Sequence, residues 1–263
     1  MDESTTGPEL SIVVPAYNEE GRIEPSLEQV RVWLVARGAP AEVLVVDDGS
    51  RDATPRIVER EMARYAESGI PLRLLGDGAN HGKGASVRTG MLEARGRVVL
   101  FSDADLSAPI EEAPKLVDPI LAGEAAVVLG SRGLDKSMIG VHQPLGREMA
   151  GRAFNLVMRM ATGLPFRDTQ CGFKAFRRDV ARDVFSRVRI ERFGFDVEAL
   201  FVARERGYRM LEVPVVWNNV EGSKVSFASG INGFLDIARV RWNHLRGVYD
   251  ELAAVVAVSL VVE

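Results

Sequence analysis

The sequence is poor in cysteine and in long apolar runs. Its one cysteine, Cys171, excludes an internal disulfide bond and a metal site built from several cysteines. The longest apolar run, Leu252–Val262, has eleven residues, whereas a membrane-spanning helix needs about 20. The N-terminus lacks the basic and apolar regions of a signal peptide. We therefore expect a cytoplasmic protein without a transmembrane helix.

The chain also lacks a basic excess. It carries 33 basic and 37 acidic side chains, and this net charge of −4 disfavours a general nucleic-acid binder. The charge is unevenly distributed, because residues 1–129 hold 13 basic and 22 acidic side chains, whereas residues 130–249 hold 20 and 12. An acidic front half and a basic back half indicate two different binding sites, such as one for a cation and one for an anion.

Apolar residues make up 46% of the chain, enough for a large core. Up to residue 130, short apolar runs alternate with amphipathic segments, which is typical of an α/β fold with a mostly parallel sheet covered on both faces. We expect strands at 10–15, 42–46, 71–75, 98–101 and 125–129, and helices at 24–37, 52–67, 84–94 and 110–121.

The regular alternation of expected strands and helices ends after residue 130. We expect helices at 147–161, 195–206 and 231–248, and a strand at 210–217 that Pro214 would place at the edge of the sheet. No internal repeat or linker is evident. We therefore expect a single domain over residues 1–249, with C-terminal helical additions to the sheet and an apolar tail at 250–263.

Acidic residues follow two of the expected strands. In open α/β sheets ligands bind beyond the carboxyl ends of the strands, so Asp47, Asp48, Asp103 and Asp105 would converge on one crevice. Carboxylates packed together repel one another, and a divalent cation is their natural partner. A lone Asp-x-Asp is more often a turn or a helix cap, but two acidic pairs after two apolar strands favour a site.

The segment Asn80-His81-Gly82-Lys83-Gly84 opens an expected helix, where unpaired backbone amides and a lysine suit an anion. It matches neither the dinucleotide motif G-x-G-x-x-G nor the Walker A motif, so a dinucleotide fold and a P-loop NTPase are disfavoured. A simple glycine turn explains this segment nearly as well.

Four motifs together resemble the family 2 glycosyltransferases of the GT-A fold: VVPAYNE (13–19), VVDDGS (45–50), NHGKG (80–84) and FSDADLSAP (101–109). Four further motifs resemble dolichyl-phosphate glucosyltransferases and their polyprenyl-phosphate relatives: GSR (130–132), RDTQCGFK (167–174), FGFDVEAL (193–200) and VWNNVEGSKV (216–225). The resemblance covers residues 10 to about 245. We expect no counterpart of the N-terminal membrane anchor of the eukaryotic enzyme, and the motifs of the resemblance do not extend into the tail after Tyr249.

The resemblance implies that the front half binds a nucleotide-sugar donor. Asp103 and Asp105 would hold Mg²⁺ or Mn²⁺ against its diphosphate, and Lys83 would add a positive charge nearby. Asp47 or Asp48 would contact the base or the ribose. The residues that would line the base and the ribose are Pro15, Tyr17 and Glu19, although core packing explains Tyr17 equally well.

The back half would bind the acceptor, a polyprenyl phosphate. Its phosphate needs cations, and the candidates are Arg132 and Arg147, with Arg152, Lys224 and the hydroxyl of Ser223 as further possibilities. Asp196 would hold a sugar hydroxyl or act as a base, and we prefer it to Glu198. The segment 170–174 would shape the sugar pocket. Cys171 within it is expected to be core, and Trp217 would stack on sugar or lipid or simply pack.

We therefore expect an inverting, metal-dependent enzyme that transfers a hexose from a nucleotide sugar, first of all UDP-glucose, to a polyprenyl or dolichyl phosphate. The alternatives are transfer from GDP-mannose, a soluble acceptor, and a nucleotide-sugar sensor without activity. The chain would be peripheral at the cytoplasmic face of the membrane. Helix 231–248 combines apolar and basic residues with Trp242 and would lie at the membrane or merely cover the sheet. The loop 133–144 would act as a lid.

Overall fold

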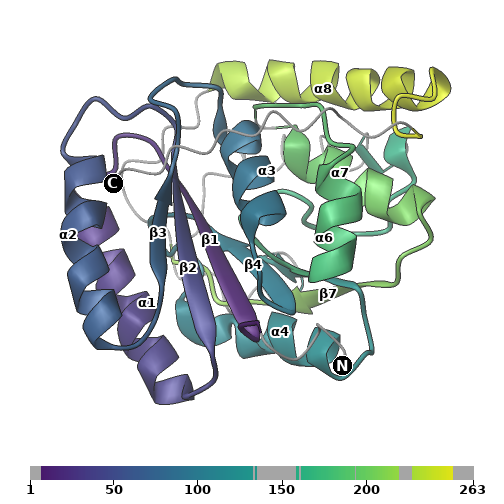
Figure 1. The fold of residues 1–263 in the computed structure, drawn as a ribbon. Coiled ribbons are helices and arrows are strands. Elements are labelled where there is room, and N and C mark those ends of the chain that lie inside the picture. The colour runs from purple at the N-terminus through teal and green to yellow at the C-terminus, as the bar shows by residue number, and fades with distance from the viewer. Residues whose placement is uncertain are drawn as a thin grey trace.

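One mixed sheet organises the molecule (Figure 1). The computed structural model describes residues 7–132, 134, 158–159, 161–192, 194–218 and 227–250, with the backbone alone for 227–234. The seven strands in this part of the chain are β1 (Leu10–Ala16), β2 (Ala41–Asp47), β3 (Leu72–Leu75), β4 (Val98–Ser102), β5 (Val127–Ser131), β6 (Phe173–Arg177) and β7 (Met210–Pro214).

The strands lie in the order β3-β2-β1-β4-β6-β5-β7. Strands β1 to β4 are parallel where they pair, and β7 runs parallel to β5. Strand β6 is antiparallel to both of its neighbours, β4 and β5. The sheet is therefore mostly parallel, and β7 ends it, as the proline in its sequence predicts.

Helices cover both faces of the sheet (Figure 1). One face packs against α1 (Ile23–Arg37), α2 (Thr54–Glu67) and α4 (Pro114–Leu121), and the other against α3 (Lys83–Glu93), α6 (Arg178–Phe185) and α7 (Phe195–Glu205). A short 3-10 turn, η2 (Ile110–Glu112), precedes α4, and α8 (Phe227–Leu245) lies against α7.

Side chains alternate along β1 between these two cores. Ile12 and Val14 belong to the core with α1 and α2, whereas Val13 belongs to the core with α3. Helix α3 comes very close to β1, because a Cβ atom at Gly90 would lie 2.2 Å from Val13 Cγ1. Both faces of the strand are thus buried, which explains why its sequence has no polar face.

The α/β fold class is confirmed, and the elements expected between residues 10 and 130 are all present, with ends shifted by at most two residues. The helix expected at 110–121 is divided into η2 and α4. The structure adds β6 and α6, which the sequence interpretation missed. Most of the helix expected at 147–161 lies outside the described residues.

Candidate active site

The carboxyl ends of β1, β2 and β4 meet at one edge of the sheet, at the top in Figure 1. Ala16 pairs with Asp47 at the ends of β1 and β2, and β4 ends beside β1 at Ser102. The segments that follow these strands carry Tyr17 to Glu19, Asp48, and Asp103 with Asp105. The expected convergence of acidic residues on one edge is therefore confirmed.

The two neighbouring aspartates at the end of β2 have different surroundings. The carboxylate of Asp48 is buried and accepts hydrogen bonds from the backbone N–H groups of His81 (2.8 Å) and Gly82 (3.0 Å) and from Asn80 Nδ2 (3.0 Å). Asp47 Oδ2 accepts one bond from the Ser50 N–H, while its buried Oδ1 has no hydrogen-bond partner among the described residues. Asp48 thus anchors the glycine-rich segment, and Asp47 retains an acceptor for a ligand.

The segment after β1 makes a tight turn over α2. Asn18 has a positive φ of 53°, and its N–H donates to Ser50 Oγ. Pro15 is buried within β1 opposite Val46, whereas the Tyr17 side chain is exposed. Packing in the core is therefore wrong for Tyr17, which lies at the surface beside the strand end.

Arg22 links this segment to the second acidic pair. Its guanidinium lies 2.7 Å from Glu19 Oε2 and 3.9 Å from Asp105 Oδ2. The sequence interpretation missed Arg22, although its spacing of three from Glu19 at a helix start is a typical ion-pair spacing. Its contact with Asp105 depends on the tertiary fold.

Asp103 and Asp105 follow β4 and differ in their partners. Asp103 Oδ1 accepts from Lys83 Nζ at 2.6 Å, and Asp105 Oδ1 accepts from the Ser107 N–H at 3.0 Å. Burial lowers the pKa of the Lys83 ammonium, but the carboxylates of Asp103, Asp196 and Asp105 outweigh that effect and hold its pKa above the ordinary value. Lys83 is therefore a charged lysine in an acidic crevice.

Asp103 and Asp105 offer two carboxylates as ligands for a divalent cation. No cluster of three or more His, Cys, Asp or Glu side chains suited to a metal occurs in the described part of the chain. Mg²⁺ is commonly held by one or two carboxylates together with substrate phosphates, so the donor set of Asp103 and Asp105 fits a metal whose remaining ligands come from a diphosphate. Gly172 leaves space for this arrangement, since a Cβ atom there would lie 2.2 Å from Asp103 Oδ2.

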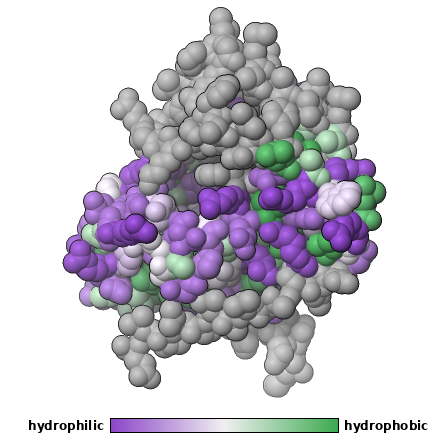
Figure 2. Space-filling model, turned by 90° about the horizontal axis from the view of Figure 1, so that it is seen from above, coloured by the Kyte–Doolittle hydropathy of each residue, from purple (hydrophilic) through white to green (hydrophobic). Residues whose placement is uncertain are grey.

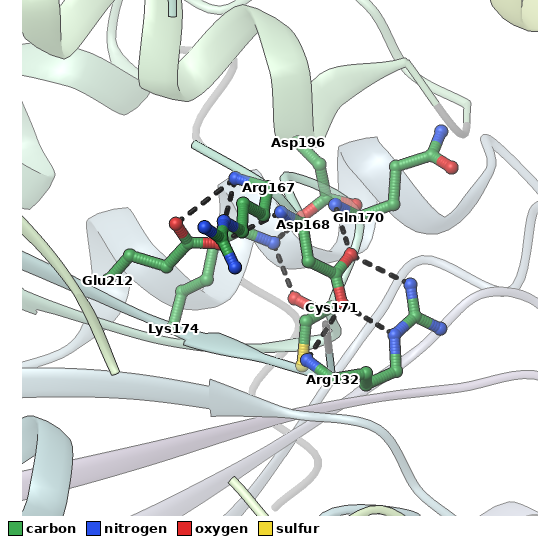
Figure 3. A network of polar contacts seen from close by, with 8 residues as sticks. All are labelled: Arg132, Arg167, Asp168, Gln170, Cys171, Lys174, Asp196 and Glu212. Carbon is green, nitrogen blue, oxygen red and sulfur yellow. Dashed lines mark hydrogen bonds and ion pairs between the residues drawn. The ribbon is translucent and has the colours of Figure 1, made fainter. Parts of the chain in front are cut away.

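Figure 3 shows a buried ion pair between Lys174 and Asp196. Lys174 on β6 is fully buried, and its Nζ donates to Asp196 Oδ1 on α7 and to the Cys171 carbonyl, each at 2.5 Å. Burial raises the pKa of the Asp196 carboxyl, although Lys174 and Lys83 act against it. Burial also raises the pKa of the Cys171 thiol to about 12, which confirms Cys171 as a core residue rather than a nucleophile.

Glu198, two residues after Asp196 on α7, has different hydrogen-bond partners. It is buried and accepts hydrogen bonds from the N–H groups of Arg189 (2.9 Å) and Ile190 (2.7 Å) and from the Tyr249 hydroxyl (2.8 Å). The two carboxylates therefore point to different sides of α7, as their spacing predicts. Asp196, paired with Lys174, is the one of the two whose charge acts on Lys83 and Asp103.

Arg132, directly after β5, is held in place on two sides. Its Nε and Nη2 donate to Asp168 at 2.6 and 2.8 Å, and its guanidinium lies 4.9 Å from the centre of the Trp217 ring. Asp168 in turn is fixed by the Glu212 carboxylate on β7, which accepts the Asp168 N–H (Figure 3). Asp168 and Glu212 were missed from the sequence. Arg147, Arg152, Ser223 and Lys224 lie outside the described residues, as does nearly all of the loop 133–144.

Residues 11–185 match glycosyl transferase family 2. The chain belongs to this family. Over 240 residues it is 35% identical to a dolichyl-phosphate beta-glucosyltransferase of Trichomonas vaginalis, covering 88% of this chain and 72% of the relative. It is 33% identical over 253 residues to the human dolichyl-phosphate beta-glucosyltransferase, covering 92% and 77% of the two chains. The enzyme is therefore a glycosyltransferase.

Solved structures support the GT-A fold of this glycosyltransferase. Glucosyl-3-phosphoglycerate synthase from Mycobacterium tuberculosis, in complex with phosphoglyceric acid, superposes with a TM-score of 0.65 at 22% identity, covering 91% of this chain and 82% of that one. The same synthase with Mn²⁺, UDP-glucose and phosphoglyceric acid gives a TM-score of 0.64 at 21% identity. None of the helices described for the present chain is long and apolar enough to cross a bilayer.

Proposed function

We propose that this glycosyltransferase transfers glucose from UDP-glucose to a polyprenyl phosphate, such as dolichyl phosphate, with inversion at the anomeric carbon. The observation that carries the proposal is the 33–35% identity, over about nine tenths of the chain, to enzymes named dolichyl-phosphate beta-glucosyltransferase from Trichomonas, Dictyostelium and human. Because the matched region includes both halves of the chain, it supports the donor and the acceptor together.

On this proposal the front half, residues 10–130, binds the donor. Asp103 and Asp105 would hold Mg²⁺ or Mn²⁺, which neutralises the charge that develops on the leaving nucleoside diphosphate. Lys83, 2.6 Å from Asp103, adds a positive charge at the same place. The unpartnered oxygen of Asp47 supports a contact with the base or ribose, and we infer that Pro15, Tyr17 and Glu19 line that end of the donor.

The back half, residues 131–249, would bind the acceptor within the same catalytic domain. A phosphate oxygen of the acceptor attacks the anomeric carbon, and the bond from that carbon to the diphosphate breaks. Since this oxygen is already anionic at neutral pH, no strong general base is required. We propose that Arg132 and Arg147 bind the acceptor phosphate, that Asp196 accepts a hydrogen bond from a sugar hydroxyl, and that the enzyme works peripherally at the cytoplasmic face of a membrane.

Incubation with labelled UDP-glucose or GDP-mannose, Mn²⁺ and detergent-dispersed dolichyl phosphate tests the proposal. We expect label from UDP-glucose to enter the lipid fraction, and Asp105→Asn to abolish this transfer. Label from GDP-mannose alone would instead identify a mannosyltransferase. Transfer only to soluble sugars, with a rate that falls as a general base is protonated, would overturn the lipid acceptor. Calorimetric binding of UDP-glucose without any turnover would identify a sensor.

A further inference from the structure

Helix α8 has one face bound to the protein and another that meets solvent. On the bound side Ile237 and Val240 are buried in the core with α7, and the His244 ring packs edge-on against Phe201 at 5.2 Å between ring centres. The Gly194 N–H donates to the Asp236 carboxylate close to the start of α7. The orientation of α8 is therefore fixed by packing over residues 236–244.

The opposite side of α8 carries large apolar side chains in water. Leu235 is 62% exposed, Trp242 60% and Leu245 73%. Their spacings of seven and three place them on one side of a helix with about 3.6 residues per turn. They are three of the seven large hydrophobic side chains that are exposed in the described part of the chain.

Basic side chains border this apolar stripe. Arg239, Arg241 and Arg246 are exposed, and the Arg246 guanidinium lies 5.9 Å from the centre of the Trp242 ring. Asp236 is the one acidic residue of α8, and its side chain is mostly buried, 3.6 Å from Arg239. Figure 2 looks down on this end of the molecule, and apolar and hydrophilic atoms intermingle on its right-hand side, where α8 lies. A tryptophan and leucines bordered by arginines match an anionic lipid surface in both polarity and charge.

Helix α8 also lies at the edge of the sheet that carries the candidate site residues. In Figure 1 it runs across the top, the edge at which the carboxyl ends of the strands emerge. Asp236 contacts Gly194, two residues before Asp196. A bilayer against the outer face of α8 would therefore lie at this edge of the sheet. The exposed Val32 and Val35 instead belong to α1, which packs on the face of the sheet opposite α7.

We propose that the outer face of α8, formed by Leu235, Trp242 and Leu245 with the three arginines, docks on a bilayer that contains anionic lipids. The docking would bring the crevice to the headgroup level, where the phosphate of a lipid acceptor lies. In this respect the inference rests on the proposed lipid acceptor, but vesicle binding requires no turnover and is measured separately.

Flotation of the full chain with vesicles tests the docking. We expect binding to phosphatidylcholine vesicles with 30% phosphatidylserine, and a loss of at least tenfold for Trp242→Glu/Leu245→Glu. The matched control is Val32→Glu/Val35→Glu, which has the same spacing and similar exposure (54% and 52%) on α1 and should bind as the parent does. Equal binding of the α8 variant and the parent would overturn the proposal.

A second variant tests whether vesicle binding depends on the three arginines. Each basic residue near an anionic surface contributes about fivefold, so Arg239→Gln/Arg241→Gln/Arg246→Gln should lose roughly a hundredfold in affinity. Arg95, Arg97 and Arg209 are exposed just ahead of strands β4 and β7, at the other edge of the sheet, and replacing these three by glutamine is the control for net charge. Equal binding to vesicles without anionic lipid would refute the role of the arginines.

Transfer rates and the oligomeric state distinguish membrane docking through α8 from the alternative explanations. With detergent-dispersed acceptor the Trp242→Glu/Leu245→Glu variant should keep the parent's transfer rate, and with acceptor in vesicles it should lose at least tenfold. If the parent transfers to no lipid phosphate yet binds vesicles through α8, the proposed function fails and the docking stands. If the parent is a dimer that this variant converts to monomers, and neither floats with vesicles, the face is an interface between two copies and the docking is refuted.

Discussion

Replacing Lys174 by methionine should cost about 3–5 kcal/mol of the free energy of unfolding, the usual result of removing one partner of a buried ion pair. Lys174 is fully buried, and its Nζ donates to Asp196 Oδ1 and to the Cys171 carbonyl. Methionine has a similar length and leaves no large cavity, so the cost comes from a buried carboxylate and a carbonyl that lose their donor. Such a loss is a large part of the about 5–15 kcal/mol that stabilises a typical domain.

Urea unfolding at pH 7, followed by far-UV circular dichroism, measures this loss. The double variant Lys174→Met/Asp196→Leu removes both charges and should recover most of the stability. Because burial already raises the pKa of Asp196, the deficit of Lys174→Met should shrink as the pH falls and the stranded carboxyl takes up a proton. A single variant within about 1 kcal/mol of the parent, or a double variant whose loss equals the sum of the two single losses, would refute the coupling.

Activity of the refolded double variant then tests the proposed role of Asp196 toward the sugar. A hydrogen bond to a charged group contributes about 1.5–3 kcal/mol, so its loss should lower kcat/KM by about 10- to 100-fold although the fold is restored. Parent-like kcat/KM in a stable double variant would show that Asp196 acts only through the ion pair.

Four other substitutions test the donor half of the site. Gly172→Ala should lower the transfer rate, and the affinity for UDP with Mn²⁺ measured by calorimetry, by at least tenfold each. The reason is that the alanine Cβ would lie 2.2 Å from Asp103 Oδ2. An unchanged affinity would contradict this close approach. Asp48→Ala should lower the melting temperature, because three hydrogen-bond donors lose their acceptor. Asp47→Ala should weaken UDP binding with little effect on the melting temperature. A destabilised Asp47→Ala together with weak UDP binding by Asp48→Ala would show that Asp47 is the structural residue and Asp48 the ligand-binding one. The hydrogen bond to Asp77 raises the pKa of His81 above 6.5, so its NMR titration midpoint should fall in Asp77→Asn. The stability from this pair is present in full below about pH 6.5 and is lost as the pH rises through the raised pKa, and an unchanged midpoint would exclude the pair.

The donor half of the site could be predicted from sequence because its chemistry is local. Strands β1, β2 and β4 each contain a run of at least three apolar residues, and the residues that follow the run must lie at the ligand-binding edge. Asp47 and Asp103 were placed in this way without any knowledge of their partners. Their neighbours Asp48 and Asp105 could not be told apart from them, since the difference lies in which backbone N–H groups reach each carboxylate.

Strand β6 could not be recognised by the same reasoning. Its sequence, Phe173–Arg177, has a lysine at a position that the sheet buries on both faces, so it lacks the apolar run of its neighbours. The lysine is tolerated only because Asp196 lies against it, 22 positions later in the sequence. A pattern analysed over a window of about ten residues does not include that partner, so the sequence interpretation assigned residues 170–174 to the sugar pocket without recognising a strand.

The opposite net charges of the two halves are explained only in part by the crevice. The basic back half was expected to present cations to an anion, yet several of its basic side chains are paired within the same half: Arg132 with Asp168, Lys174 with Asp196, and Arg187 and Arg206 with Asp183. The exposed Arg239 and Arg241 instead lie on α8, and the exposed Arg246 follows its last residue. An acidic and a basic side chain paired within this half cancel in its net charge, so the positive excess comes mainly from its other basic side chains. Part of that excess therefore marks a surface of the molecule rather than its active site.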